Sequence, residues 1–137
     1  MRFVRMGSAI ALAAVCVAAT ITPANAEEPL HEVTYSVFSE LPFRAADIYY
    51  RDTEPVNWSD YSHDPYVFSP KVEADIGPSK KWVLSVQLAN PDEWAMVAAT
   101  SGPSPTPPNI HCVLAVDGVV VAENSGAKGA LCSLRHW

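Results

Sequence analysis

The sequence lacks the short motifs that identify most catalytic and cofactor-binding sites. It contains no G-x-S-x-G nucleophile elbow, no H-E-x-x-H zinc motif, no C-x-x-C pair and no glycine-rich phosphate loop. Only three cysteines and four histidines are present, and the histidines are scattered along the chain. We therefore expect no enzyme activity, no metal site and no cofactor.

One short segment, with the sequence DYSHD, places acidic groups beside a histidine. Asp60 and Asp64 flank His63, and these three side chains could bind a metal ion or relay a proton. A metal site needs three or four ligands held in rigid geometry, whereas a segment of Ser and Asp typically forms a turn, so we favour a turn. His31 and His136 lie near the two termini expected for the mature domain, where disorder is the default.

Basic residues are scarce. The chain has 9 Lys and Arg against 15 Asp and Glu, which gives a formal net charge of −6. Such a surface repels nucleic acid and anionic lipid headgroups, so we expect no nucleic-acid partner. The simplest interpretation of the charge is solubility.

No apolar run reaches the about 20 residues that a membrane-spanning helix needs. Arg2 and Arg5 precede an uncharged stretch at 6–21, and Ala-Asn-Ala follows at 24–26. A basic start, an apolar run and an A-x-A ending are the three parts of a secretory signal. We predict a signal peptide at 1–26 and an extracytoplasmic domain at 27–137, in the periplasm or envelope or secreted, with retention of the segment as an anchor as the alternative.

The cysteines fit export. Cys16 lies inside the apolar run and follows Val15 rather than a small residue, so we do not expect a lipid anchor there. Cys112 and Cys132 then form an even pair in an oxidising compartment, where a disulfide is the usual outcome. A free, reactive thiol is the alternative.

Alternation of apolar and polar residues dominates the rest of the chain. A period of two is typical of half-buried β-strands. Clear alternation covers 33–38, 46–51, 82–88 and 110–116, and weaker strand candidates cover 67–75, 94–100, 119–123 and 130–134. In the 110–116 run, His111 alternates onto the face opposite Cys112 and should face solvent. No helix is expected, apart from a possible short one within 92–100.

Turn signals separate these runs. Asp117-Gly118 favours a two-residue type I′ hairpin that pairs the strand ending at Val116 with 119–123, because both turn positions need positive φ. Residues 52–66 are polar and aromatic and indicate a long loop. The proline-rich stretch at 102–109 should carry the chain from one sheet to the other.

About eight short strands predict an all-β fold, a two-layer antiparallel sandwich. The two cysteines are 20 residues apart with no Trp between them, which differs from the spacing of a true immunoglobulin domain. We expect the disulfide to tie the last strand to the hairpin opened by Asp117-Gly118.

Aromatic residues are concentrated in one stretch, at positions 49, 50, 58, 61, 66 and 68. Aromatic rings with polar groups are favoured at interfaces. The candidate binding surface comprises Trp58, Tyr61, His63, Tyr66 and Phe68. The alternative is that these rings cap one end of the sandwich.

The C-terminal half resembles the MmpS-type proteins of mycobacteria, which are small accessory subunits of RND-type lipid transporters. The resemblance rests on IHCVLAVDGVV at 110–120 followed by GALCSL at 129–134. It implies an immunoglobulin-like sandwich with the Cys112–Cys132 disulfide. It also implies a role in exporting envelope lipids or siderophores beside a large transporter.

Two features differ from that family. Its members are typically anchored by an N-terminal transmembrane helix, whereas this chain carries the features of a cleavable signal. The aromatic segment at 57–68 is also not typical of it. From the resemblance we expect, despite these differences, a non-catalytic envelope protein that binds an RND-type transporter or an envelope lipid. The alternative is a secreted module that binds carbohydrate or protein, including as an inhibitor, without a transporter.

Overall fold

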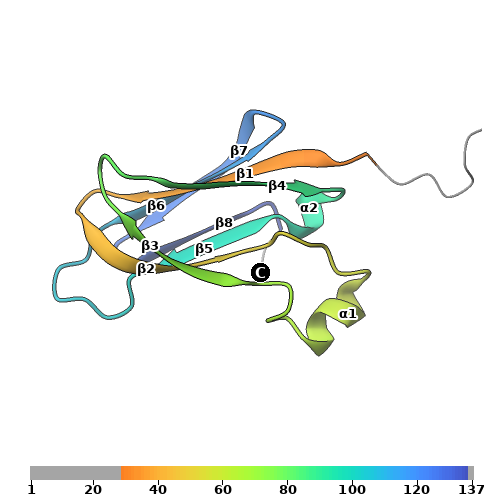
Figure 1. Ribbon diagram of the computed structural model, residues 1–137, viewed down its shortest axis with the longest axis horizontal. Helices are drawn as coiled ribbons and strands as arrows, with labels where there is room; N and C mark the ends of the chain where they lie inside the picture. Colours follow the sequence, from red (N-terminus) through yellow and green to blue (C-terminus); the bar gives the residue numbers. More distant parts are fainter. Residues whose placement is uncertain (1–28, 136–137) are drawn as a thin grey trace, which may run out of the picture.

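The computed structural model describes residues 29–135, so the predicted signal peptide, Cys16 and His136 lie outside the described residues. The described part contains eight strands and two short helices (Figure 1). In chain order they are β1 (His31–Ser39), β2 (Phe43–Tyr50), α1 (Trp58–His63), β3 (Lys71–Ile76), β4 (Trp82–Leu88), α2 (Pro91–Trp94), β5 (Met96–Thr100), β6 (Ile110–Val116), β7 (Val119–Gly126) and β8 (Gly129–Ser133).

The strands form two four-stranded sheets that face each other. One sheet has the order β4-β1-β6-β7 and the other β3-β2-β5-β8, and each pair of neighbouring strands is antiparallel. The segment between β5 and β6 crosses from one sheet to the other, as its proline-rich sequence predicts. The predicted two-layer antiparallel β-sandwich is therefore confirmed.

The core lies between the sheets, where alternate residues of each strand point inward. In β1, Val33, Tyr35 and Val37 have no exposed surface, and Ile48 in β2 and Leu114 in β6 are equally buried. Burial of such side chains contributes about 1.5–3 kcal/mol each to folding. The alternation in the sequence thus identified the inward face correctly.

The disulfide joins the two sheets. Cys112 in β6 and Cys132 in β8 are bonded, and both are 1% exposed. The bond ties the last strand to the β6–β7 hairpin, as expected. At the turn of this hairpin Asp117 has φ +51° and Gly118 has φ +83°, which confirms the predicted turn with two positive φ angles.

The helix α1 corrects the expectation that 52–66 forms only a loop and that DYSHD is a turn. In α1, Asn57 is the N-cap, and its side-chain oxygen accepts a hydrogen bond of 2.8 Å from the backbone N–H of Asp60. In α2, Pro91 occupies the first turn, where its missing N–H costs nothing. The short helix expected within 92–100 is therefore present only up to Trp94. From Met96 the chain forms β5, which pairs with β2 and β8.

One strand is shorter than its sequence suggests. Residues 67–69 lie in turns rather than in a strand, since the N–H groups of Val67 and Phe68 donate to the carbonyls of Asp64 and Pro65. Pro70 lacks an N–H group, and β3 begins only after it. Across residues 29–135, neither helix has the length or apolar character to cross a membrane.

The strand registers place the connections at two opposite ends. Val33 pairs with Val116, and Tyr50 pairs with Val97. One end, which we call the loop end, therefore holds residues 51–70, α2, the Asp117-Gly118 turn and the last residues of β8. The opposite end, the far end, holds the β1–β2, β3–β4, β5–β6 and β7–β8 connections.

Candidate functional site

The predicted surface residues all lie at the loop end, on a segment that projects from the sandwich (Figure 1). Trp58, Tyr61 and His63 belong to α1, whereas Tyr66 and Phe68 follow it in the return to β3. The structure thus places all five residues on one continuous segment.

The rings of this segment pack against a tryptophan that the sequence did not single out. Trp94 in α2 is 4% exposed and stacks on Trp58 with ring centroids 6.2 Å apart. Tyr61 lies 5.6 Å from Trp94 and 5.2 Å from Trp58, and Phe68 lies 6.4 Å from Tyr61, all measured between ring centroids. Trp94 therefore forms the base of an aromatic cluster with Trp58, Tyr61 and Phe68.

Two arginines lie against this cluster. The Cζ atom of Arg51 is 4.7 Å from the ring centroid of Tyr61 and 5.7 Å from that of Trp94. The Cζ atom of Arg135 is 4.4 Å from the centroid of Trp58 and 5.5 Å from that of Trp94. Cation–π contacts of this kind are worth about 0.5–2 kcal/mol each, and more when desolvated. Both arginines therefore contact Trp94, and each also contacts a ring of α1.

Arg51 is fully buried, although the alternation in β2 placed it on the outer face. The strand ends at Tyr50, so Arg51 is free to leave the alternation and turn inward. Its backbone is fixed there, because its N–H donates to the carbonyl of Met96 at 3.1 Å. Sequence periodicity cannot reveal such a change of direction at the end of a strand.

Tyr35 connects this arginine to the core. Its hydroxyl donates a 2.6 Å hydrogen bond to the Arg51 carbonyl and accepts a 3.4 Å bond from the Met96 N–H. Burial raises the pKa of Tyr35 to about 12, because the charged phenolate would be desolvated. The start of the loop is therefore anchored to β1.

Part of the aromatic segment is open to solvent. Tyr66 is 82% exposed, Val67 is 63% exposed and Trp58 is 49% exposed. Tyr61 and Phe68, by contrast, are half-buried. The two interpretations of the segment thus apply to different residues. Tyr61 and Phe68 cap the end of the sandwich, whereas Trp58, Tyr66 and Val67 offer an apolar surface.

The Asp60, His63 and Asp64 group does not converge. The Asp60 carboxylate accepts from the Val56 N–H at 3.4 Å, and His63 is exposed. In the part of the chain that the structure describes, no three His, Cys, Asp or Glu side chains are placed to share a metal ion. The geometry gives no support to a metal site or a proton relay at this position.

His31 is ordered within β1, so the expectation of disorder there is wrong. Its Nδ1 lies 2.6 Å from a carboxylate oxygen of Asp117, whose other oxygen accepts from the Glu32 N–H at 2.9 Å. The hydrogen bond from His31, followed by that from Glu32, lowers the pKa of Asp117. These contacts join the start of β1 to the β6–β7 turn at the loop end.

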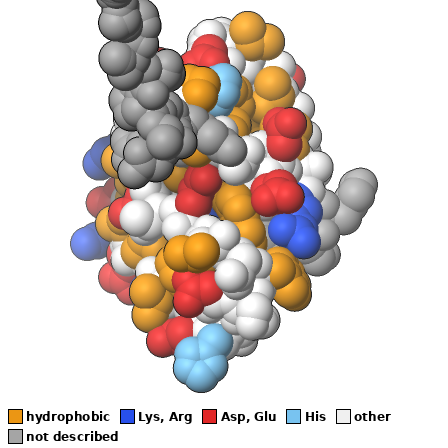
Figure 2. Space-filling view, turned by 90° about the vertical axis from the view of Figure 1, so that its right-hand side faces the viewer, with side chains coloured by type: hydrophobic (Ala, Val, Ile, Leu, Met, Phe, Trp, Pro, Cys, Tyr) orange, Lys and Arg blue, Asp and Glu red, His pale blue; other side chains and the backbone are white. Residues whose placement is uncertain are grey.

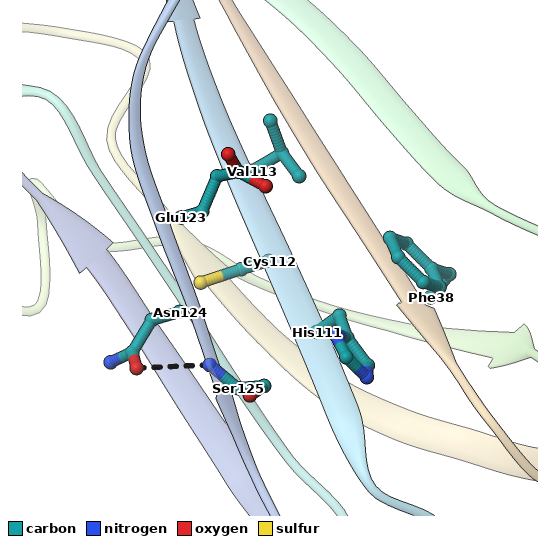
Figure 3. Close-up of a pocket in the computed structure, with 7 residues that line it drawn as sticks. All are labelled: Phe38, His111, Cys112, Val113, Glu123, Asn124 and Ser125. Carbon is teal, nitrogen blue, oxygen red and sulfur yellow. Dashed lines mark hydrogen bonds between the residues drawn. The ribbon is translucent and has the colours of Figure 1, made fainter.

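A separate shallow groove of about 330 Å³ lies on the outer face of the β4-β1-β6-β7 sheet, over β1, β6 and β7 (Figure 3). It is lined by Phe38, His111, Cys112, Val113, Glu123, Asn124 and Ser125. His111 is only half-buried there: its ring stacks on Phe38, with centroids 4.9 Å apart, and its Nε2 lies 2.8 Å from Glu40. The sulfur of Cys112 is held in the disulfide, so no thiol nucleophile faces His111.

Comparison with known proteins identifies a family of β-sandwich domains. The model of a family described as the Rv2576c β-sandwich domain matches residues 35–132. The chain is 34% identical over 114 residues to the uncharacterized protein Rv2576c of Mycobacterium tuberculosis, an alignment that covers 83% of this chain and 73% of the relative. The uncharacterized protein Mb2606c of Mycobacterium bovis matches to the same extent.

Proposed function

This chain belongs to the Rv2576c β-sandwich domain family, and we propose that it is an exported, non-catalytic protein that binds a partner through its loop end. The observation that carries the proposal is the exposure of Trp58, Tyr66 and Val67 on a segment whose base is packed. An aromatic side chain held in place loses little entropy when a partner binds, so it makes an effective anchor.

The packing beneath the exposed residues supports this proposal. Trp58 is stacked on the buried Trp94 and lies under Arg135, and α1 is capped by Asn57. The exposed surface is therefore supported by the sandwich rather than presented on an unstructured loop. Recognition surfaces are commonly built in this way, from loops that a rigid scaffold positions.

Export is supported by two features. The Cys112–Cys132 disulfide persists best in an oxidising compartment outside the cytoplasm. The sequence at 1–26 has the three parts of a secretory signal. The site of action that we propose is accordingly the cell envelope or the medium.

A narrower form of the proposal is a role as accessory to an RND-type lipid or siderophore transporter. It is favoured by the C-terminal segment, in which a cysteine strand, an Asp-Gly turn and a second cysteine strand form the disulfide-bonded unit of β6, β7 and β8. The alternative is a secreted module that binds carbohydrate or protein. The accessory role and the secreted module would use the same surface of this chain and would differ only in the partner bound.

Crosslinking and affinity capture from envelope and medium test the proposal, with the tagged full chain compared with its Tyr66→Ala/Val67→Ala variant. Both side chains are exposed, so the variant should fold normally. A partner that is captured by the unaltered chain and lost by the variant supports the proposal, and a transporter subunit among such partners supports the accessory role. Identical captures by both chains would contradict it.

A further inference from the structure

Charge is distributed unevenly between the two ends of the molecule. Residues 52–70 contain Asp52, Glu54, Asp60 and Asp64 but no Lys or Arg. The two arginines next to this segment lie against aromatic rings, and Arg51 is fully buried. The exposed charge of the segment is therefore acidic.

Four exposed basic residues lie at the far end, whereas Lys71, at the start of β3 beside the loop end, pairs with Asp47 and Glu73 on the strands. Arg44 lies at the start of β2, Lys80 and Lys81 lie between β3 and β4, and Lys128 lies in the β7–β8 turn. The strand registers place all of these positions opposite the loop end. The acidic character of the loop end is thus local and does not merely reflect the net charge of the chain.

Within residues 52–70, the carboxylates of Asp52 and Asp64 are available to a partner, whereas Glu54 accepts from the Asn90 N–H and Asp60 from the Val56 N–H. Of the ion pairs formed between described residues, none involves Asp52, Glu54, Asp60 or Asp64. Asp52 accepts only from the neighbouring Thr53 hydroxyl, at 3.0 Å, and its side chain is exposed. A Lys or Arg side chain of a partner could therefore pair with these carboxylates without displacing a basic group of this chain.

Exposed apolar side chains lie between these carboxylates. Val56 is 89% exposed, and Tyr66 and Val67 follow Asp64 closely in the chain. Figure 2 looks onto this side of the molecule and shows hydrophobic and acidic side chains next to one another, with a Lys or Arg group beside acidic side chains on the right. The surface therefore combines exposed apolar side chains with negative charge.

We infer that the loop end binds a polypeptide surface in which apolar side chains are accompanied by Lys or Arg. This inference rests on the proposed function and specifies its partner. Opposite charges across an interface speed encounter and exclude wrong partners, while the apolar contacts supply affinity. An anionic membrane or a nucleic acid would instead be repelled by the same carboxylates.

A titration of the isotope-labelled, disulfide-bonded chain, followed by its amide NMR signals, tests the inference. The probe is a synthetic amphipathic peptide of Leu and Lys, and the matched control is the same peptide with Glu in place of Lys. We expect the Lys peptide to shift the signals of residues 56–67 and the Glu peptide to leave them unchanged. The effect should weaken as salt is raised, because exposed charges are screened.

Variants separate the two parts of the surface. Asp52→Asn/Asp64→Asn should weaken binding of the Lys peptide by about three- to tenfold, since each exposed charge pair is worth only a fraction of a kcal/mol to about 1 kcal/mol. Tyr66→Ala/Val67→Ala should weaken it by about tenfold or more, because it removes two of the exposed apolar side chains. Glu123→Gln removes a negative charge from an exposed strand position outside the loop end and should change affinity little.

Three results would overturn the inference. The first is that the Lys peptide leaves the signals of 56–67 unchanged. The second is that zwitterionic phosphatidylcholine vesicles, added in place of the peptide, shift these signals equally in the unaltered chain and in Asp52→Asn/Asp64→Asn. The third is that the signals change with protein concentration alone, which would indicate a second copy as the occupant. The proposed function is judged separately, by the affinity capture with Tyr66→Ala/Val67→Ala. A captured partner together with a failed peptide titration would refute only the partner class.

Discussion

Tyr35 connects the core of the sandwich to the loop end. It is buried in β1, and its hydroxyl meets the Arg51 carbonyl and the Met96 N–H, which lie where β2 ends and β5 begins. Buried backbone groups without a partner are costly, so this single hydroxyl helps to fix the direction in which the chain enters the aromatic segment. The position of Arg51 under the rings follows from it.

Replacing this hydroxyl should destabilise the fold. We expect Tyr35→Phe to lower the free energy of unfolding by about 1–3 kcal/mol in urea denaturation at neutral pH, because two buried backbone groups lose a partner. The raised pKa of Tyr35 predicts that its contribution is complete below pH 10.0 and is lost as the pH rises through about 12. An unchanged free energy of unfolding in Tyr35→Phe would show that the hydroxyl does not matter.

The His31–Asp117 pair predicts a dependence on acid pH. Because the folded pKa of Asp117 is lowered from 3.8, its contribution to stability is present above pH 3.8 and is lost as the pH falls through the lower folded value. We expect His31→Ala to raise the pKa of Asp117 towards 3.8, measured from the carboxyl NMR signal. His111→Ala serves as the control, since His111 contacts Glu40 instead, and should not move it.

At the scale of single elements, α1 connects local sequence to the surface. The helix has only six residues and no buried one, so its packing rests on the rings of Trp58 and Tyr61. Isolated helices of this length are not stable in water. The Asn57 cap and the contacts with Trp94 must therefore hold it together.

Removal of the cap tests this dependence. Asn57→Ala should destabilise α1 by about 1 kcal/mol, because the Asp60 N–H loses its partner. We expect faster amide hydrogen exchange in 58–63 and a reduced near-ultraviolet circular dichroism signal of the stacked tryptophans. Ser59→Ala, an exposed change within the same helix, should alter neither, and equal effects of the two changes would argue against the cap.

The strands could be predicted from sequence because burial of one face imposes a period of two over five or more residues. The β6–β7 turn was predictable because Asp117-Gly118 tolerates the two positive φ angles that it requires. The helix α1 was missed because six residues are too few to show a helical period. Its one local signal was Asn57 followed three residues later by Asp60, a spacing typical of a helix N-cap.

The candidate site was predictable only in part, for the same kind of reason. Trp58, Tyr61, Tyr66 and Phe68 are close in sequence and could be grouped by composition. Trp94 and Arg135 join them only through the pairing of β5 with β2 and β8, which no local pattern reveals. Long-range contacts thus decide which rings are buried and which face solvent.

At the scale of the whole molecule, the disulfide crosses the core from one sheet to the other. It closes a loop of 20 residues, and the chain-entropy model assigns such a bond about 3 kcal/mol. We expect Cys112→Ser/Cys132→Ser to lower the free energy of unfolding by about 2–4 kcal/mol, measured by urea denaturation. A loss well below 1 kcal/mol would contradict the view that this bond supports the sandwich.

The most direct test of the central claim, recognition through the loop end, is site-specific photo-crosslinking in a mycobacterial host. A photoreactive amino acid replaces Tyr66 in one tagged chain and Val83 in another; both positions are exposed, but Val83 lies on the outer face of β4. The account predicts a crosslinked partner from position 66 and none from position 83. Crosslinking that is equal at both positions, or absent from position 66, would contradict it.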